Sequence, residues 1–336
     1  MLGAIDQGLI YALVALGVFL TFRILNFADL TVDGSFTTGT ATAAILIFNG
    51  VNPIVATVMG FIGGAIAGTL TGLLHTKCHI DPLLSSILVM LALYSINTRI
   101  MGLGYDHVQR AMVPLLGKQS IFSWLVAHRL RDTWTMIALI GVGVLIIVVI
   151  VNWYLSTKFG LAVMATGDNP GMASSLGINT DFTKIATLAL SNGLVGLAGA
   201  TYAQYTGSSV ITDGTGTILI GLASVILGNA IFGTRYLWLA TLGVVFGSVL
   251  YRLAIYGALK WSFLSSSDMK LITALLVVIA LVLTQSSQVK VLVNKISPWR
   301  SKPNAPEPMS VAPNQFSPFA AVDQTLGTPA PKEADA

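Results

Sequence analysis

Residues 52–74 read NPIVATVMGFIGGAIAGTLTGLL, a stretch without a single charged side chain. A helix needs about 20 apolar residues to cross the hydrocarbon core of a bilayer, and this stretch is long enough. Gly60, Gly64, Gly68 and Gly72 recur every four residues, which places them along one face of such a helix. A stripe of small residues lets another backbone approach closely, so we predict tight helix packing along it.

The composition extends this conclusion to most of the 336-residue chain, because 54% of its residues are hydrophobic and only 10% are charged. Soluble globular proteins carry roughly 25% charged residues, and a soluble enzyme of this length could not cover its surface with so few. We therefore predict an all-α, polytopic membrane protein with about eight or nine transmembrane helices. The apolar segments that could form them are residues 2–22, 33–49, 52–74, 83–101, 134–155, 182–204, 215–232, 236–257 and 270–285.

Lys and Arg in short loops indicate the orientation of a membrane protein, because they stay preferentially on the cytoplasmic side. Their distribution favours an N-terminus outside and a C-terminus inside, although the predicted outer loop, residues 102–133, also holds several basic residues. Part of that loop is apolar, so we expect it to lie in the membrane interface. The first basic residue, Arg23, follows the apolar stretch Leu2–Phe22, which indicates a retained span and not a cleavable signal.

The chain divides into two unequal parts by composition. Residues 1–297 form the predicted membrane domain, and eight of the twelve prolines lie in residues 298–336. This Pro-rich segment cannot bury enough apolar surface to offset its ordering entropy, so we predict a disordered cytoplasmic tail. The tail is either a dispensable extension or a partner-binding segment.

Several classes of function are excluded by what the sequence lacks. The single cysteine, Cys78, excludes a disulfide framework and a cysteine-based metal site. No P-loop, nucleophile elbow or His-Glu-x-x-His motif occurs, so we expect no enzyme and no ATP site of its own. Glu occurs only at Glu307 and Glu333, both in the tail, which excludes a Glu-based proton relay within the membrane.

His75 and His79 stand four residues apart with Asp81 close behind, a spacing that could hold a metal on a helix. Pro82 follows closely and the stretch resembles a short loop, so we expect a basic cytoplasmic anchor and no metal site. The formal charge of +4 is modest and fits the cytoplasmic loops of a membrane protein, so we expect no nucleic-acid partner.

A first polar interruption, RILNFADLTVDGSF, occupies residues 23–36 between two apolar segments. It is either a cytoplasmic loop whose Asp33 caps the next helix or a helix break that lines the path of a polar substrate. Asn97 lies within a predicted span, where an amide either joins two helices or contacts a substrate. The candidate residues for the substrate path or gate are Asn26, Asp29, Asp33 and Asn97.

A second polar interruption, residues 156–181, predicts a two-turn helix on the cytoplasmic side. Its signals are an N-cap, a proline at the first helical position, a short apolar face and a terminating glycine. Such a helix either docks into a groove of a soluble partner or lies on lipid headgroups. The candidate coupling residues are Asn169, Pro170, Met172, Ala173, Leu176 and Gly177.

Two stretches together carry a family resemblance. GLIYALVALG at residues 8–17, followed by RILNFAD at residues 23–29, resembles the first conserved region of ABC-importer permeases of the branched-chain amino acid type. GLAVMATGDNPGMASSLGIN at residues 160–179 is similar to their cytoplasmic coupling region, and the run from Gly193 through Gly196 to Gly199 continues the match. We predict that these three glycines serve helix packing.

The resemblance covers about residues 5–285. The sequence DLTVDGSF at residues 29–36 resembles that of a subgroup of amino-acid importers, some of which are linked to tryptophan or tyrosine uptake. The wider family has Glu-Ala-Ala at the start of the coupling motif. Here Gly171-Met172-Ala173 occupies that stretch, whereas the following glycine, Gly177, is retained.

The resemblance implies a multi-pass permease of the bacterial plasma (inner) membrane that translocates a small solute, an amino acid. Two identical permease subunits, a homodimer, form the path. Separate cytoplasmic ABC ATPase subunits bind ATP and Mg and receive the short helix 170–176 in a groove. An extracytoplasmic substrate-binding protein delivers the solute. This chain itself binds no cofactor and contacts membrane lipid.

Two other classes of function stay open at this point. A self-sufficient secondary transporter or channel for a small polar solute would need intramembrane acids for ion coupling, of which the chain has few. A membrane scaffold without transport would leave the two polar interruptions unexplained.

Overall fold

The computed structural model describes residues 2–103, 110–122, 134–233 and 236–259, together with Ala274, Leu275 and Val278. The predicted span 270–285 falls almost wholly outside the described residues, as does the predicted tail 298–336. All of the described residues belong to one unit, Met1–Val293.

The first apolar segment forms α1 (Leu2–Val18), which continues as a π-helical turn, η1 (Phe19–Ile24). The chain is then non-helical until Thr31, so a genuine break separates the first two long helices. The remaining helices are α2 (Thr31–Phe48), α3 (Pro53–Thr76), α4 (Pro82–Gly102), α6 (Trp134–Ser156), α7 (Lys158–Asp168), α8 (Pro170–Ser175), α9 (Thr180–Thr206), α10 (Thr217–Phe232) and α11 (Leu237–Leu259).

Local sequence signals explain where several helices begin. The side chains of Asn52, Asp81 and Asn169 each accept a hydrogen bond from a backbone N–H in the first turn of α3, α4 and α8. Each of these caps is followed by a proline at the first helical position, where the missing N–H has no cost.

Two short strands depart from the predicted all-helical fold. β1 (Met112–Pro114) pairs antiparallel with β2 (Ser208–Val210), which directly follows α9. Strands of three residues are too short for the alternating pattern that reveals a strand in a sequence, so the prediction missed them.

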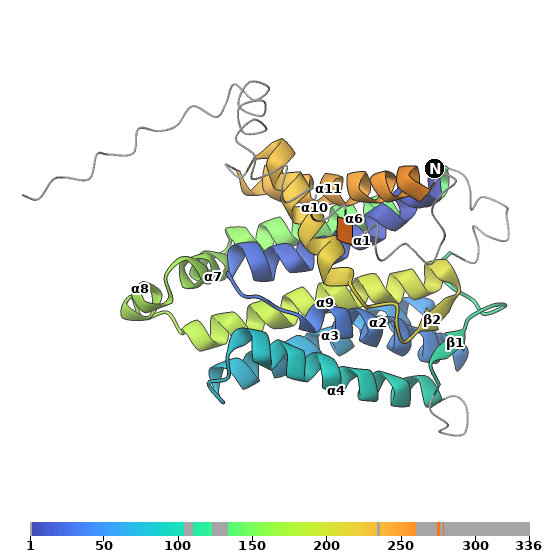
Figure 1. Ribbon diagram of the computed structural model, residues 1–336, viewed down its shortest axis with the longest axis horizontal. Helices are drawn as coiled ribbons and strands as arrows, with labels where there is room; N and C mark the ends of the chain where they lie inside the picture. Colours follow the sequence, from blue (N-terminus) through green and yellow to red (C-terminus); the bar gives the residue numbers. More distant parts are fainter. Residues whose placement is uncertain are drawn as a thin grey trace, which may run out of the picture. The chain divides into compact units, whose positions relative to one another are not determined.

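α9 is the central helix of the bundle, because α1, α2 and α3 all pack against it (Figure 1). α4 covers α2 and α3, whereas α10 and α11 pack against each other and against α1. The polar segments α7 and α8 lie at the end of the bundle opposite the first turn of α1 (Figure 1).

The glycine stripe of α3 faces α9. A Cβ atom at Gly64 would overlap the carbonyl group of Asn192, and one at Gly68 would overlap that of Leu188. Because no side chain separates them, the two backbones approach each other as closely as small residues allow.

The ends of this stripe and the glycines of α9 complete the contact. A Cβ atom at Gly60 would lie 2.7 Å from the Ala200 Cβ, and one at Gly72 would lie 2.9 Å from the Ile185 Cα. Of the three predicted packing glycines of α9, Gly199 faces α2, where a Cβ atom would overlap the Phe36 carbonyl oxygen, and the other two face α3. A Cβ atom at Gly193 would meet the Phe61 ring, and one at Gly196 would overlap the Gly60 carbonyl oxygen.

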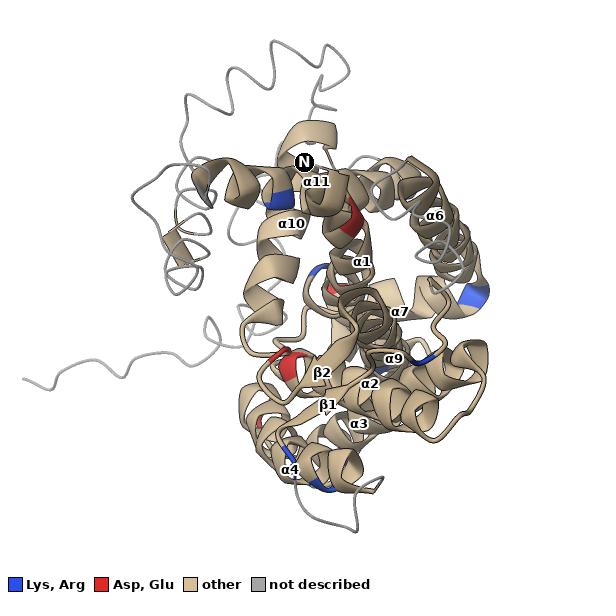
Figure 2. Ribbon diagram, turned by 90° about the vertical axis from the view of Figure 1, so that its right-hand side faces the viewer, with Lys and Arg blue, Asp and Glu red and all other residues tan. Residues whose placement is uncertain are grey.

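Six helices in the described part of the chain are long and apolar enough to cross a membrane. They are Leu2–Ile24, Pro53–Thr76, Pro82–Gly102, Trp134–Ser156, Thr180–Thr206 and Leu237–Ala258. The predicted segments 33–49 and 215–232 are helical as well, but α2 is rich in Thr and Gly and α10 has only 16 residues. The exact number of spans and the N-out, C-in orientation stay predictions. Figure 2 shows how few acidic and basic residues the helices carry.

Candidate substrate path and coupling region

The break between η1 and α2 is anchored at Asp29. Its side chain is 3% exposed, and one carboxylate oxygen accepts a hydrogen bond of 2.9 Å from the Thr31 backbone N–H. The other accepts a hydrogen bond of 2.6 Å from the Asn192 side-chain amide. The Asn192 carbonyl oxygen in turn accepts one of 2.7 Å from the Ser35 hydroxyl. A buried polar network therefore joins the break, α2 and α9.

This network lies deep within the bundle. Asn192 is near the middle of α9, which has 27 residues and is therefore about 40 Å long. A carboxylate at that depth is costly unless its oxygens are paired, and both oxygens of Asp29 are. At Asp29 the break is thus a satisfied internal structure, whereas Asn26 and Ala28 within it are exposed.

Asp33 holds the start of a different helix from the one that the sequence suggests. It lies in the first turn of α2, whose N-cap is Leu30 and has no side-chain cap. The Asp33 carboxylate accepts hydrogen bonds from the backbone N–H groups of Gly216 and Ile218, at 2.8 and 2.9 Å, and from the Thr217 hydroxyl at 3.0 Å. The prediction that Asp33 caps its own helix was wrong, because the three donors at the start of α10 are satisfied by it instead.

α10 consequently begins part-way along the bundle (Figure 1). The segment before it packs on α2, since a Cβ atom at Gly214 would overlap the Asp33 carbonyl oxygen. Non-helical backbone at membrane depth is tolerated where protein surrounds it, as in the broken helices of transporters. The Asp213 carboxylate accepts a hydrogen bond of 2.7 Å from the Val210 N–H of β2, which closes the turn at the start of this segment.

A cleft of about 220 Å³ opens beside Asp33 between α2, α4 and residues 211–215. Asn97 lines it and is fully buried. Its amide nitrogen donates a hydrogen bond of 3.3 Å to the Gly34 carbonyl, whereas its Oδ1 has no hydrogen-bond partner among the described residues. Tyr94 and Met90 add an aromatic and an apolar wall, so the cleft suits a small amphipathic solute.

The structure brings two of the four predicted path residues together. Asp33 and Asn97 line the same cleft, whereas Asp29 does not line it and pairs with Asn192. Asn26 is exposed and has a left-handed backbone with φ +54°, a conformation that Asn tolerates better than most residues. It shapes the turn out of η1 and lies apart from the other three.

We expect Asp33→Asn to destabilise the protein by about 1–2 kcal/mol, because the amide loses the charge at the helix N-terminus and one acceptor oxygen. The melting temperature of the purified chain should fall by roughly 3–6 °C. Asp81→Asn is the matched control, because Asp81 caps α4 at an exposed site where Asn caps equally well. Equal melting temperatures for the two variants would contradict this role of Asp33.

The coupling region begins with α7, which packs directly on the break. A Cβ atom at Gly167 would overlap the Ile24 carbonyl oxygen at the end of η1. The Thr166 hydroxyl lies 3.1 Å from the Thr183 hydroxyl of α9. A displacement of α7 would therefore be transmitted to both the break and the central helix, since the first contact joins backbone to backbone and the second joins two short, buried side chains.

α8 occupies the place where the sequence predicts a short helix. The Asn169 side chain accepts a hydrogen bond of 3.0 Å from the Met172 N–H, and Pro170 takes the first helical position. Ala173 is buried and faces the rest of the protein, whereas Met172 and Leu176 are 62% and 68% exposed. Two large apolar side chains one turn apart thus face away from the protein.

Gly177 closes α8 with a left-handed backbone, φ +82°. The Ile178 N–H bonds to the Ala173 carbonyl and the Gly177 N–H to the Ser174 carbonyl, at 3.1 and 2.9 Å, which is the Schellman arrangement. No atom lies near its missing Cβ, so the glycine serves the backbone angle and not a close contact.

We expect Gly177→Ala to weaken α8 by about 1 kcal/mol, because a Cβ is strained at positive φ. The amides of residues 169–179 should then exchange with deuterium about five times faster, as measured by mass spectrometry. Gly177→Asn should exchange close to the wild-type rate, since Asn tolerates this backbone region. Unchanged exchange in the Ala variant would refute the left-handed cap.

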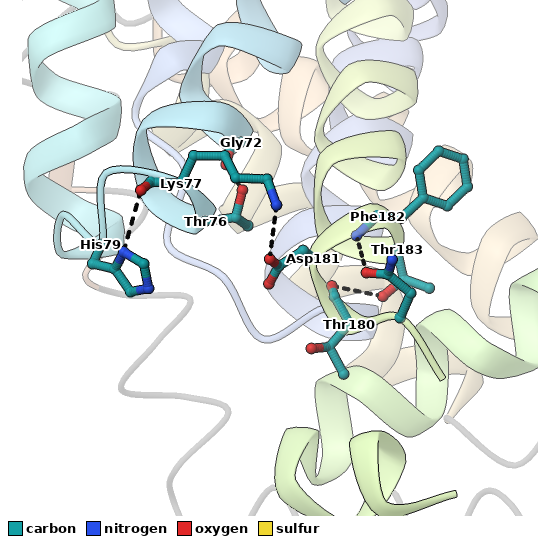
Figure 3. Close-up of polar contacts among 9 residues, drawn as sticks. Gly72, Thr76, Lys77, His79, Thr180, Asp181, Phe182 and Thr183 are labelled. Atoms are coloured by element: carbon teal, nitrogen blue, oxygen red, sulfur yellow. Dashed lines mark hydrogen bonds and ion pairs between the residues drawn. The ribbon is translucent and has the colours of Figure 1, made fainter. Parts of the chain in front are cut away.

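Charged residues tie α3 to α9 at the same end of the bundle (Figure 3). Lys77 and Asp181 form an ion pair of 3.4 Å, both exposed. The two nitrogens of His75 lie 2.8 Å from the Ile80 carbonyl and 3.3 Å from the Lys184 ammonium. His75 thus has protein partners on both sides, and His79 lies 3.2 Å from the Lys77 carbonyl (Figure 3).

Sequence reasoning missed two charged residues within the fold. Asp213 adjoins the start of α10, and Arg252 is 8% exposed in α11. A charged residue inside the apolar segment 236–257 was the available signal for Arg252, because such residues are costly in a membrane and mark functional positions.

Comparison with known proteins identifies the family of this helical bundle. Residues 1–287 match the family described as branched-chain amino acid transport system / permease component. The chain belongs to this family of permeases. As a permease with several apolar helices, it is a multi-pass protein of the bacterial inner membrane.

The relatives of the permease are named for the transport of different solutes. It is 38% identical to a tyrosine transport system permease protein of Clostridioides difficile (strain R20291), over 83% of this chain and 89% of that protein. It is 26% identical to a ribose import permease protein of Escherichia coli (strain K12), over 67% of each chain. It is 25% identical to a probable branched-chain amino acid transport permease of Methanocaldococcus jannaschii, over 72% of this chain and 76% of that protein. No solved structure matches the permease.

Proposed function

We propose that this permease is the membrane subunit of an ATP-driven importer for an amino acid, and that α8 is its docking element for the ATPase. The observation that carries the docking role is the pair Met172 and Leu176. Both are large, apolar and exposed on a helix that is capped at both ends. An exposed apolar pair on a rigid helix fits a groove on a soluble partner.

The partners follow from the family. A cytoplasmic ABC ATPase binds ATP and Mg, since this chain has no P-loop, and an extracytoplasmic binding protein delivers the solute. Two permease subunits form the path. The permease has no catalytic activity of its own, and it takes the N-out, C-in orientation, with α7 and α8 on the cytoplasmic side.

The mechanism uses the contacts that lead from α8 to the break. Closure of the ATPase dimer moves α8 and with it α7. Gly167 passes this displacement to Ile24, and Thr166 passes it to α9. The break anchored by Asp29 then reorients against Asn192, which changes access to the path. The rigid packing of α3 on α9 makes those two helices move as one body.

The solute is an amino acid, and aromatic amino acids are the first to test. The support is the relative named for tyrosine transport, which is 38% identical over most of both chains. The relative named for ribose transport is more distant, at 26% identity. The aromatic and apolar wall of the cleft beside Asp33 suits the side chain of such a solute.

The test is uptake of labelled L-tyrosine, L-tryptophan and L-leucine into vesicles that contain the permease with its co-expressed ATPase and binding protein. We expect uptake only with all three proteins and ATP. Deletion of residues 170–176 or Gly177→Trp should abolish both ATPase association and uptake. Uptake by the permease alone, driven by an ion gradient, would instead support a secondary transporter, and unchanged transport after the deletion would refute the docking role.

A further inference from the structure

α11 carries one charged residue in an otherwise apolar helix, Arg252. The side chain is 8% exposed. An ionised side chain within a membrane helix is expensive and is retained where it serves a path, a partner or a ligand. The surroundings of Arg252 therefore decide which of these it serves.

The position of Arg252 is fixed by tight packing of α11 on α1. A Cβ atom at Gly8 would lie 2.9 Å from the Val249 Cα, and the Ser248 hydroxyl donates a hydrogen bond of 2.7 Å to the Gly8 carbonyl. The guanidinium carbon lies 4.0 Å from the centre of the Tyr11 ring. Stacking on a ring orients the planar guanidinium and leaves its edge available for hydrogen bonds.

Among the described residues, no carboxylate forms an ion pair within 4.0 Å of Arg252. The ion pair of Lys77 with Asp181 lies at the other end of the bundle. The Arg252 Nε has no hydrogen-bond partner in the described part of the chain. A buried donor without a partner costs roughly 1–3 kcal/mol, more when charged, so this arrangement favours an incoming acceptor.

A cavity of about 270 Å³ lies against Arg252 and provides room for such an acceptor. Its other lining residues combine a side-chain amide, two phenols and small or apolar groups: Gly3, Ala4, Gln7, Tyr205, Ile255 and Tyr256. The Tyr205 hydroxyl donates a hydrogen bond of 3.5 Å to the Asp6 carboxylate, which is buried. The Arg252 cation thus lines this aromatic cavity, and the Asp6 anion lies behind the Tyr205 phenol.

We propose that this cavity binds the carboxylate of the amino-acid solute through Arg252, with Tyr205 and Tyr256 beside the rest of the molecule. The inference rests on the proposed function, which makes the solute an amino acid. A planar guanidinium edge matches a carboxylate with two parallel hydrogen bonds. A phosphate fits less well, since Arg252 is the one cation among the described residues that line the cavity and would leave a second negative charge unpaired.

The location agrees with a receiving site for solute. The cavity is lined by the first turns of α1 and by the C-terminal end of α9, at the end of the bundle opposite α8 (Figure 1). With the proposed orientation this is the extracytoplasmic end, where the binding protein releases its solute. The cavity is separate from the cleft beside Asp33, with which it shares no lining residue.

The experiment measures uptake of labelled L-tyrosine and ATPase activity for the full importer in phosphatidylcholine vesicles. Arg252→Gln should lower uptake at least about tenfold, the effect of losing one charged hydrogen-bond pair, while ATPase stimulation by the loaded binding protein stays within about twofold. Arg252→Lys keeps the charge but lacks the planar guanidinium with its two parallel N–H donors, and should give intermediate uptake. Arg99→Gln, an exposed change on α4, is the control and should match wild type.

The outcomes separate the inference from the proposed function. If wild type transports none of L-tyrosine, L-tryptophan and L-leucine, the proposed function fails first. If wild type transports but Arg252→Gln does so within twofold, only the carboxylate subsite is refuted. A parallel fall of uptake, ATPase activity and melting temperature in both Arg252 variants would show a structural cation and would also overturn it. If Arg252→Gln fails to fold, the uptake and the ATPase activity of Arg252→Lys decide between these outcomes.

A second arm tests the chemistry of the ligand directly on the purified permease. Excess L-phenylalanine should raise the melting temperature of wild type by about 1 °C or more, whereas phenylalaninamide, which lacks the carboxylate, should not. Arg252→Lys should show a smaller shift. An equal shift with the amide would refute carboxylate recognition. A dependence of uptake on Arg252 that appears only when anionic lipid is added would assign the cavity to a lipid headgroup and overturn the proposal.

Discussion

The double variant Met172→Asp, Leu176→Asp should weaken binding of the ATPase at least about a hundredfold, or about 2.7 kcal/mol. Burying one such apolar side chain contributes roughly 1.5–3 kcal/mol, and a buried carboxylate without a partner adds a further cost. Co-purification of the ATPase and ATP-driven uptake should both be lost. The measurement is pull-down of the ATPase by tagged permease, with titration where binding remains.

The stability of the permease alone should not change in this variant. Both side chains are already exposed, at 62% and 68%, so their replacement removes no internal contact. Leu161→Asp is the matched control, because Leu161 is 59% exposed on the adjacent α7. Wild-type ATPase binding by the double variant, or an equal loss in the control, would place the docking surface elsewhere.

Gly196→Ala should destabilise the permease by about 2–3 kcal/mol, although it adds a single methyl group. The new Cβ would overlap the Gly60 carbonyl oxygen and lie 3.1 Å from the Gly64 Cα. Backbone atoms of α3 cannot rotate away as a side chain would, so the two helices must separate. The melting temperature in detergent should fall by roughly 5 °C or more, and the yield of folded protein should fall with it.

Gly143→Ala is the control for this prediction and should have the opposite sign. Gly143 lies in the middle of α6, and no atom comes within 4 Å of its missing Cβ. Replacement of an uncrowded helical glycine by Ala stabilises a helix by roughly 0.5–1 kcal/mol. If Gly196→Ala were as stable as Gly143→Ala, the close contact of α3 and α9 would be excluded.

The coupling helix shows how far local signals reach. Asn169, Pro170 and Gly177 each act on backbone atoms within a few residues, so their order along the chain predicts the bounds of α8. The exposure of Met172 and Leu176 is also a local consequence, because Ala173 occupies the inward face of a two-turn helix. What binds this face cannot be read from these residues alone.

The polar residues of the path show where local reasoning stops. Asp33 looks like an N-cap for its own helix, since Asp before Gly-Ser is a common helix start. Its carboxylate instead accepts hydrogen bonds at the start of α10. The Thr217 hydroxyl, which donates one of them, lies 184 residues further along the chain. No pattern along the chain records that distance, because it depends on how α2 and α10 pack.

Arg252 shows the same limit in a different way. Its type and its place in an apolar segment were visible. Its stacking on Tyr11, the cavity beside it and an Nε without a partner among the described residues arise from the contact of α11 with α1. Those features come from two helices more than 200 residues apart, so they cannot be derived from either segment.

The sequence by itself determined the membrane location, the helical class, the polar interruption at residues 23–36 and the short helix at Pro170–Ser175. These follow from composition and from interactions within a few residues, which every part of the chain carries with it. The tertiary structure alone decided that Asp29 pairs with Asn192, that Asp33 starts α10 and that Arg252 faces a cavity. Burial and hydrogen bonding at these sites depend on which helices meet, and that is a property of the packed bundle.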